Sequence, residues 1–166
     1  MADRARQIRI PPKGTKGFSL PFGSVLGKLF QPMARMQVSR YRRSTGTEQP
    51  VMMGFPTVLL TTVGAKSGIE RTHVLGGFPD GEDAWLIVAS NAGARTHPAW
   101  FINLAKNPDK VWLEVGHLKF RANADSLQGP ARMAALERVA AVAPRYGGYQ
   151  KKTDREIPVI RITPAV

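Results

Sequence analysis

The chain has 166 residues, of which 43% are hydrophobic and 22% charged, the size and composition of one globular domain. It contains no cysteine, so disulfides, thiolate nucleophiles and cysteine-ligated metal sites are excluded. The net charge is +12, and residues 1–50 hold ten Lys or Arg against two acids, which favours an anionic partner near the N-terminus.

Residues 1–45 form a basic N-terminal arm and helix, which we expect to precede a folded domain over residues 46–166. The first ten residues are rich in charge and no apolar span of 18 residues follows, so neither a signal peptide nor a membrane-spanning helix is predicted. Residues 1–20 contain Pro11 and Pro12 and a lysine–glycine run, which predict an irregular or mobile arm. A cytoplasmic location is the expectation.

Residues 21–43 predict an amphipathic helix, kinked or broken near Pro32, because apolar residues recur there every three or four positions. Two interpretations stay open. The apolar stripe packs on the domain and leaves the cations in water, or it lies on anionic lipid at the inner face of the cell membrane. Aromatic and basic residues do not alternate along this run, so a nucleic-acid partner is not expected.

The rest of the chain predicts strands joined mainly by tight turns, with two helices between them. β-Branched runs bounded by turn residues mark the strands, and Pro98 and Pro130 mark the helix starts. The expected strands are 57–63, 71–78, 84–89, 111–115, 118–124 and 157–163, and the expected helices are 98–106 and 130–143. Hairpin connections favour antiparallel pairing, so we predict the α+β class: a small β-barrel of about six mostly antiparallel strands with outer helices.

The turn after the first long strand, Gly64 to Arg71, has the composition of a phosphate site. Its glycines let a ligand approach the backbone, Lys66 and Arg71 supply positive charge, and Ser67 supplies a hydroxyl. The GxxxxGK[ST] spacing of a P-loop is absent. A polar hairpin turn with solvated cations is the alternative interpretation.

The loop from Ser90 to Pro98 leads from a strand into a helix, where free amide groups and the helix dipole favour an anion or a ring carbonyl. His97 would cap the helix or contact a ligand there. Trp100 either walls a flat ring or packs in the core.

Tyr146 and Tyr149 flank two glycines after the last predicted helix. They predict a flexible turn whose phenols line a pocket, or else two ordinary surface aromatics. The three histidines lie in unrelated segments, so no metal site is predicted, and no GxSxG supports a serine hydrolase. An enzyme of this composition would take its chemistry from a bound cofactor.

Four segments together resemble the deazaflavin-dependent nitroreductase family, the split β-barrel oxidoreductases that use coenzyme F-420. They are LLTTVGAKSGIERTHVL, IVASNAG, HPAWFINLAKNP and YGGYQKKTDREIPVIRI, in order from about Val58 to Pro164. The resemblance implies a split β-barrel of the flavin-reductase type. It also implies hydride transfer from the reduced deazaflavin to an electron-poor acceptor: a quinone, an enone or a nitroaromatic.

The resemblance implies roles for individual residues. The coenzyme phosphate would contact Lys66, Ser67 and Arg71, and the coenzyme would run along His73, Val74 and Leu75. Its ring would lie beside Ala89, Ser90 and Asn91, next to the helix start at Ala99 and Trp100. Tyr146, Tyr149 and Ser90 are the implied catalytic residues, which orient the acceptor or supply a proton.

The chain departs from the family at the wall of the acceptor pocket. Gly76 and Ala143 stand where relatives carry tyrosines, and His73–Val74 stands where nitroimidazole-reducing relatives carry Asn-Pro. The lost phenols predict a roomier, less polar pocket for a bulky apolar acceptor such as a quinone or an enone.

Two other functions stay open: a split-barrel oxidase that uses flavin mononucleotide (FMN), and a non-catalytic protein that binds the deazaflavin or a lipid. Some family members associate with membranes through a variable N-terminal segment, which supports peripheral membrane contact through residues 21–43. A homodimer is expected, because barrels of this type often pair.

Overall fold

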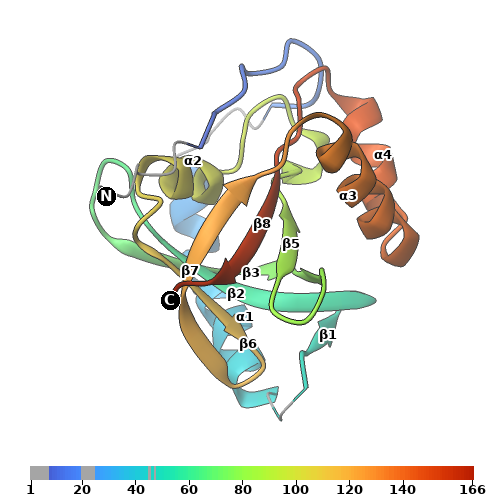
Figure 1. Cartoon of the computed structure of the whole chain (residues 1–166). Helices are drawn as coiled ribbons and strands as arrows, with labels where there is room; N and C mark the ends of the chain where they lie inside the picture. Colours follow the sequence, from blue (N-terminus) through green and yellow to red (C-terminus); the bar gives the residue numbers. More distant parts are fainter. Residues whose placement is uncertain (1–7, 20–24, 45, 47) are drawn as a thin grey trace, which may run out of the picture.

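The computed structural model describes residues 8–19, 25–44, 46 and 48–166, arranged around one curled antiparallel sheet (Figure 1). The helices are α1 (Val25–Ser44), α2 (Ala99–Lys106), α3 (Gly129–Val142) and α4 (Arg145–Lys152), with a short 3-10 helix η1 (Asn91–Gly93). The strands are β1 (Val51–Met52), β2 (Phe55–Val63), β3 (Glu70–Gly76), β4 (Phe78–Pro79), β5 (Trp85–Val88), β6 (Val111–Val115), β7 (Leu118–Ser126) and β8 (Val159–Pro164). The predicted α+β class is confirmed.

The strand order is β1-β2-β6-β7-β8-β5-β4, and β3 also pairs with β2. Every pair is antiparallel, and β1 and β4 have only two residues each, so the remaining strands carry the sheet. In Figure 1, α3 and α4 lie side by side next to β5, and α2 lies across one end of the sheet. The predicted split β-barrel type with outer helices is confirmed, and its sheet forms a half-barrel.

Two apolar clusters hold these layers together. The inner cluster fills the curl of the sheet and is closed by α2, with Leu60 and Phe101 among its buried members. The outer cluster packs α3 on the far face of β5 and β8. Alternation along β5 separates the two clusters, because Ile87 points into the inner one and Leu86 into the outer one.

Two of the predicted elements are wrong in part. The strand predicted over 71–78 stops at Gly76, because the N–H of Gly77 donates to the carbonyl of Pro56 and the chain then turns to pair β4 with β5. The flexible turn predicted at Tyr146 and Tyr149 is helix α4, which packs on α3 and η1. The third difference lies in α1, which continues through Pro32 without a break.

Tyr41 anchors α1 to the sheet. Its buried hydroxyl lies 3.3 Å from the carbonyl oxygen of Thr57 and 3.2 Å from that of Glu114, and it accepts from the N–H of Gly116 at 3.1 Å. Arg42 forms a two-pronged ion pair with the Glu114 carboxylate at 3.0 and 2.8 Å. The C-terminal half of α1 is therefore fixed against β2 and β6.

Residues 8–19 are irregular, which confirms one of the two predicted alternatives, and they form a strap that is bound to the domain. Ile8 is buried in the inner cluster. The backbone N–H groups of Thr15 and Lys16 each donate to the Asp154 carboxylate at 2.8 Å. The remainder of the predicted arm lies outside the described residues.

Candidate functional site

The turn between β2 and β3 presents two backbone donors that no described group uses. Hydrogen bonds from Gly64 to the Ile69 carbonyl and from Gly68 to the Gly64 carbonyl close the turn. Gly68 has a φ of 67°, a conformation that favours glycine. Within the described residues, the N–H groups of Lys66 and Ser67 have no partner, so both can bind a ligand.

Two cations accompany these donors. Lys66 and Arg71 are exposed, and neither side chain forms a hydrogen bond or an ion pair within the part of the chain that the structure describes. The Ser67 hydroxyl accepts from the N–H of Ile69 at 3.2 Å, which braces the turn and leaves the O–H free to donate. Free amides, a hydroxyl and two unpaired cations together suit a phosphate group.

The residues expected along the coenzyme on β3 point to two different faces of the sheet. His73 and Leu75 pair with inner-cluster residues of β2, whereas Val74 pairs with Leu59. Directly opposite residues of antiparallel strands share a face. Burial, followed by the charge of Arg71, lowers the pKa of His73, so its imidazole is neutral at pH 7.

Helix α2 runs between the basic turn, residues 64–71, and the loop of residues 89–97 that precedes the helix in the chain. The side-chain oxygen of Asn103 accepts from the N–H of Ala65 at 3.0 Å, and the side chain of Asn107 donates to the carbonyl of Val63 at 3.2 Å. The other end of α2 begins at Ala99, directly after the predicted ring site. Since an α-helix rises about 1.5 Å per residue, the two predicted sites lie on the order of 10 Å apart along α2.

The ring loop, residues 89–97, has an unusual backbone. Asn91 and Ala92 both adopt left-handed conformations, with φ of 44° and 53°. The Asn91 side chain donates to the carbonyl of Thr96 at 3.0 Å, so it braces the loop. Ser90 is buried, with 9% of its surface exposed.

The remaining residues predicted at the ring differ in exposure. Ala89 and Trp100 belong to the inner cluster, and Trp100 is only 6% exposed, so the indole packs in the core. Ala99 is exposed at the start of α2. Of the two residues predicted at this helix start, Ala99 is therefore the one that a ligand can reach.

Sequence reasoning missed Arg155, whose side chain is 1% exposed and holds the ring loop. Its guanidinium donates to the carbonyls of Ala89 at 3.2 Å, Ser90 at 2.9 Å and Ala94 at 3.0 Å, and to Nδ1 of His97 at 2.9 Å. Burial lowers the pKa of Arg155 to about 10, which still leaves it charged at pH 7. No sequence signal marks this residue, because Asp-Arg-Glu resembles a solvated charge run.

The phenols of Tyr146 and Tyr149 lie together near the end of β3. Their ring centroids are 5.4 Å apart, and Tyr146 meets the rings of Phe55 and Phe78 edge-on at 5.8 and 5.4 Å. Burial, followed by the neighbouring Tyr149, raises the pKa of Tyr146 to about 12, so this phenol is a proton donor at neutral pH. Because α4 packs on η1, the tyrosines and the ring loop are neighbours.

The open pocket wall predicted at Gly76 and Ala143 is wrong. A Cβ atom on Gly76 would lie 2.7 Å from the Tyr146 hydroxyl, and 3.1 and 3.2 Å from the Phe78 and Phe55 rings. Ala143 is buried in the outer cluster. The volume left by a smaller residue at position 76 is therefore taken by Tyr146.

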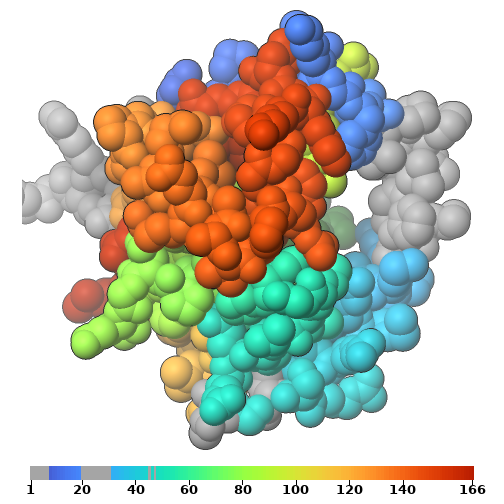
Figure 2. Space-filling view, turned by 90° about the vertical axis from the view of Figure 1, so that its right-hand side faces the viewer, coloured from blue at the N-terminus to red at the C-terminus, as the bar shows by residue number. Residues whose placement is uncertain are grey.

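A groove of about 870 Å³, lined by apolar and basic side chains, lies instead between α1, the β1 region and β3. It lies on the face shown in Figure 2, where α1 (blue) sits beside the segment around β1 (teal). Met33 and Met36 are 50% and 61% exposed, so this part of the predicted apolar stripe does not pack on the domain. The groove is lined by Met33, Met36, Gln37, Arg40, Arg43, Ser44, Pro50, Val51, Met52, Met53 and Val74.

Known proteins match most of this chain. The family model described as F-420H(2)-dependent quinone reductase matches residues 33–164. An F-420H(2)-dependent quinone reductase of Mycobacterium tuberculosis (strain ATCC 25618 / H37Rv) is 38% identical over 135 residues, which cover 79% of this chain and 89% of that relative. The strap at residues 8–19 precedes the matched range.

Two solved structures are also similar. One, described as an F-420-H2 dependent reductase (FDR-A), is 36% identical, covers 64% of this chain and 93% of its own, and has a TM-score of 0.58. The other, described as a domain-swapped dimer, is 33% identical, covers 77% of this chain and 95% of its own, and has a TM-score of 0.60.

Proposed function

The chain belongs to the F-420H(2)-dependent quinone reductase family, and from this premise we propose that it passes a hydride from the reduced deazaflavin coenzyme to a quinone. The observation that carries the proposal is the arrangement along α2: unpaired cations at one end, and the ring loop with the neighbouring phenols at the other. A coenzyme with an anionic tail and a flat redox ring suits this arrangement.

In this proposal the basic turn binds the phosphate and glutamate tail of the coenzyme. The free amides of Lys66 and Ser67, the Ser67 hydroxyl and the charge of Arg71 are the donors. The ring lies at the ring loop, and when bound it supplies the hydride for the reduction. The other residues that we propose to contact it are His73, Leu75, Ser90, Asn91 and Ala99, whereas Val74 lines the groove on the opposite face of β3, and Ala89 and Trp100 pack in the inner cluster.

In this proposal the phenols of Tyr146 and Tyr149 contact the quinone that accepts the hydride. A quinone that receives a hydride needs one more proton to become a quinol. Tyr146 can supply it, because a phenol whose pKa is raised to about 12 stays protonated in neutral solution. Tyr149 contacts the Tyr146 ring and offers a second hydroxyl, and Ser90 is the third candidate to orient the acceptor.

A binding titration tests the coenzyme assignment. The oxidised deazaflavin and FMN are added separately, and absorbance or fluorescence is followed. We expect the deazaflavin to bind at least tenfold more tightly, because its tail offers more negative charge to the turn. If neither ligand binds more tightly than about millimolar, the proposal is refuted.

A turnover assay separates catalysis from storage. The reduced deazaflavin is mixed with the protein and a quinone, and we expect the coenzyme to be oxidised as the quinol accumulates. A coenzyme that binds but stays reduced with quinone, enone and nitroarene acceptors would favour a binding protein without catalytic activity.

We further propose that the α1 face touches a membrane surface without crossing it. Among the described residues, no helix is long and apolar enough to span a bilayer. Exposed Met33, Met36 and Met53 lie beside Arg40 and Arg43, which is the composition of an interfacial surface on anionic lipid.

Liposome flotation tests this surface. We expect the chain to float with vesicles that contain anionic lipid, and Met36→Ser with Met53→Ser to reduce the bound fraction. Met133→Ser is the control, since Met133 is 53% exposed, against 61% for Met36 and 67% for Met53, but lies on α3. Equal flotation of the double variant and the wild type would refute the surface.

A homodimer is our remaining proposal, supported by a solved relative described as a domain-swapped dimer. Among the described strands β3 pairs with β2 alone, so its other edge is where we propose that a strand of a second chain pairs. Light scattering after size-exclusion chromatography measures the mass, and a monomer at all concentrations would refute pairing.

A further inference from the structure

Arg155 is a buried cation that no described acid neutralises. All four of its side-chain hydrogen bonds go to neutral acceptors, and all four acceptors belong to the ring loop. A buried guanidinium is unfavourable unless nearby dipoles offset the loss of water. Here three carbonyl dipoles and one imidazole nitrogen offset it, so Arg155 and the ring loop form one unit.

These bonds, together with one from the N–H of Gly93 to the Ser90 carbonyl at 2.8 Å, decide which way the neighbouring amides point. The described peptide bonds are all trans, and in a trans peptide the C=O of one residue and the N–H of the next point in opposite directions. The carbonyls of Ala89 and Ser90 point at Arg155, so the N–H groups of Ser90 and Asn91 point away from it. Neither N–H has a partner among the residues described.

The backbone of the loop brings these donors together. Ser90 is right-handed, with φ −72° and ψ −34°, and Asn91 and Ala92 are left-handed. Successive right- and left-handed residues form a concave nest of N–H groups that suits an anion. Left-handed conformations are unfavourable for residues other than glycine, and the contacts to Arg155 and Thr96 stabilise them.

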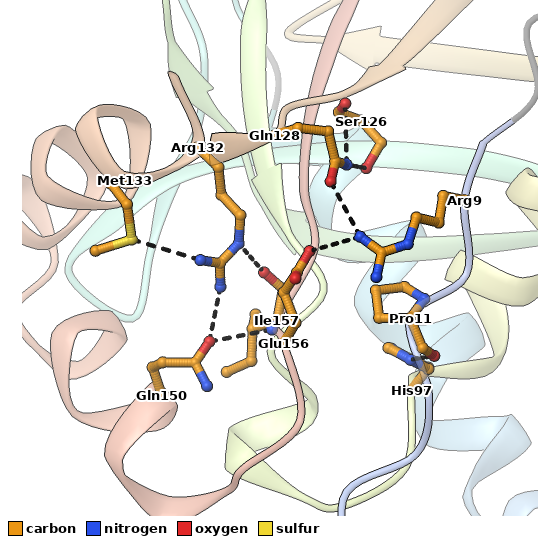
Figure 3. Close-up of polar contacts among 10 residues, drawn as sticks. All are labelled: Arg9, Pro11, His97, Ser126, Gln128, Arg132, Met133, Gln150, Glu156 and Ile157. Atoms are coloured by element: carbon orange, nitrogen blue, oxygen red, sulfur yellow. Dashed lines mark hydrogen bonds and ion pairs between the residues drawn. The ribbon is translucent and has the colours of Figure 1, made fainter. Parts of the chain in front are cut away.

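The strap supports the same arrangement through His97. Arginine can only donate, so Nδ1 of His97 must be the acceptor and Nε2 must carry the proton. Nε2 lies 2.7 Å from the carbonyl oxygen of Pro11 and donates to it (Figure 3). The contact therefore fixes the imidazole in the tautomer that Arg155 requires.

We propose that Arg155 is a positioning residue for the coenzyme ring: it holds the loop carbonyls inward and leaves the amides of Ser90 and Asn91 as donors to the ring. This inference rests on the proposed function, because the ring must lie at this loop. Fixed donors aimed at a ring stabilise negative charge on it, so they favour the more electron-rich, reduced form.

Arg132 provides a matched control. It is also a buried arginine, 8% exposed, and it donates to the carbonyl of Ile157 at 2.9 Å and to the side chain of Gln150 at 2.7 Å (Figure 3). None of its contacts reaches the ring loop. Arg132→Lys thus disturbs a buried arginine that reaches Arg155 through Gln150, whose side chain donates to the Arg155 backbone carbonyl at 2.7 Å, and among the described residues it has no contact of its own with the loop carbonyls.

The experiment measures the dissociation constants of the oxidised and the reduced deazaflavin for the wild type, Arg155→Lys and Arg132→Lys. We expect Arg155→Lys to weaken binding of the reduced form by about tenfold, and of the oxidised form by less, since lysine keeps the charge but cannot hold the carbonyls in place. Arg132→Lys should leave the ratio of the two constants unchanged. Thermal unfolding of each variant measures the purely structural effect.

Wild-type affinities in Arg155→Lys, or an unchanged ratio, would overturn the proposal. If Arg155→Lys does not fold, nuclear magnetic resonance of the labelled wild type decides: coenzyme must shift the amide signals of Ser90 and Asn91, and unshifted signals overturn it. A wild type that binds neither form refutes the proposed function itself, whereas loss confined to Arg155→Lys supports the inference.

Discussion

Gly76 lets the Tyr146 phenol lie at the end of β3. In Gly76→Ala the new Cβ would stand 2.7 Å from the phenol oxygen, so the phenol must move. We expect kcat with a quinone to fall by roughly tenfold, because a displaced general acid protonates the acceptor less well. Coenzyme affinity should change little.

Gly148→Ala is the control for this substitution, since a Cβ on Gly148 meets nothing within 4 Å. Tyr146→Phe measures the hydroxyl directly and should lower kcat at least as much as Gly76→Ala. Full activity in Tyr146→Phe would remove Tyr146 from the proton path.

Lys66 and Arg71 should contribute to coenzyme affinity through charge. Replacing both with alanine should weaken deazaflavin binding by roughly ten- to a hundredfold, because each charge-assisted contact contributes modestly at an exposed site. The loss should shrink at high salt, which screens exposed charges. Lys110→Ala with Lys119→Ala is a charge-matched control on exposed positions of the β6–β7 region, and equal losses in both pairs would contradict a specific phosphate site.

At the scale of elements, the strap depends on one exposed carboxylate. Asp154 accepts from both the N–H and the hydroxyl of Thr15 and from the N–H of Lys16, and these bonds, led by the Thr15 hydroxyl, lower the pKa of Asp154 to about 2. Asp154→Asn weakens these acceptors and should loosen the strap. A looser strap should be cleaved by trypsin after Lys13 or Lys16 faster in the variant than in the wild type.

The same variant tests whether the strap and the ring loop are coupled. Gly14 donates to the carbonyl of Arg95, and Arg95 donates to that of Phe18, so release of the strap should also speed amide exchange in the ring loop. The exposed Asp109→Asn serves as the control. If exchange in the ring loop is the same in both variants, the two segments move independently.

Helix α4 shows where local reasoning fails. Two adjacent glycines lower helix propensity, and Tyr-Gly-Gly-Tyr therefore predicts a turn. In the structure the glycines allow close packing, since a Cβ on Gly147 would lie 3.4 Å from the Cβ of Ala140 on α3. Packing on α3 and η1 outweighs the weak propensity.

For the whole molecule, the shifted pKa values predict loss of stability in acid. Burial lowers the pKa of His73 and His97, so the unfolded chain takes up protons at higher pH than the folded chain does. The contribution of the two neutral imidazoles to the free energy of unfolding is fully present above about pH 6.5 and declines as the pH falls below that value. The contribution of Asp154 is present above about pH 4 and is lost as pH falls through 2.

Thermal unfolding between pH 8 and pH 2 measures this profile. We expect a constant Tm above pH 7, a first fall between pH 6.5 and 5, and a further fall below pH 4. His73→Gln should reduce the first fall, because it removes one of the two half-buried imidazoles. A Tm that rises from pH 7 to pH 5 would contradict the assignment.

The sequence by itself determined the strands, the hairpins, the α+β class and the basic turn between β2 and β3. These features depend on neighbours within a few residues: alternation, β-branched runs, and Gly, Pro and Asp at turns. Lys66 and Arg71 belong to one hairpin, so the sequence alone predicts that they lie close together.

Only the tertiary structure decided how the two ends of the site are joined and braced. Arg155 reaches acceptors 58 to 66 positions away, and Tyr146 lies against a glycine on another element. Such contacts arise when a curled sheet and its helices bury their apolar faces together. A local sequence pattern does not predict which distant loop will lie against a buried charge. The chemistry of the ring loop therefore depends on long-range packing, whereas the charge of the basic turn is a local property.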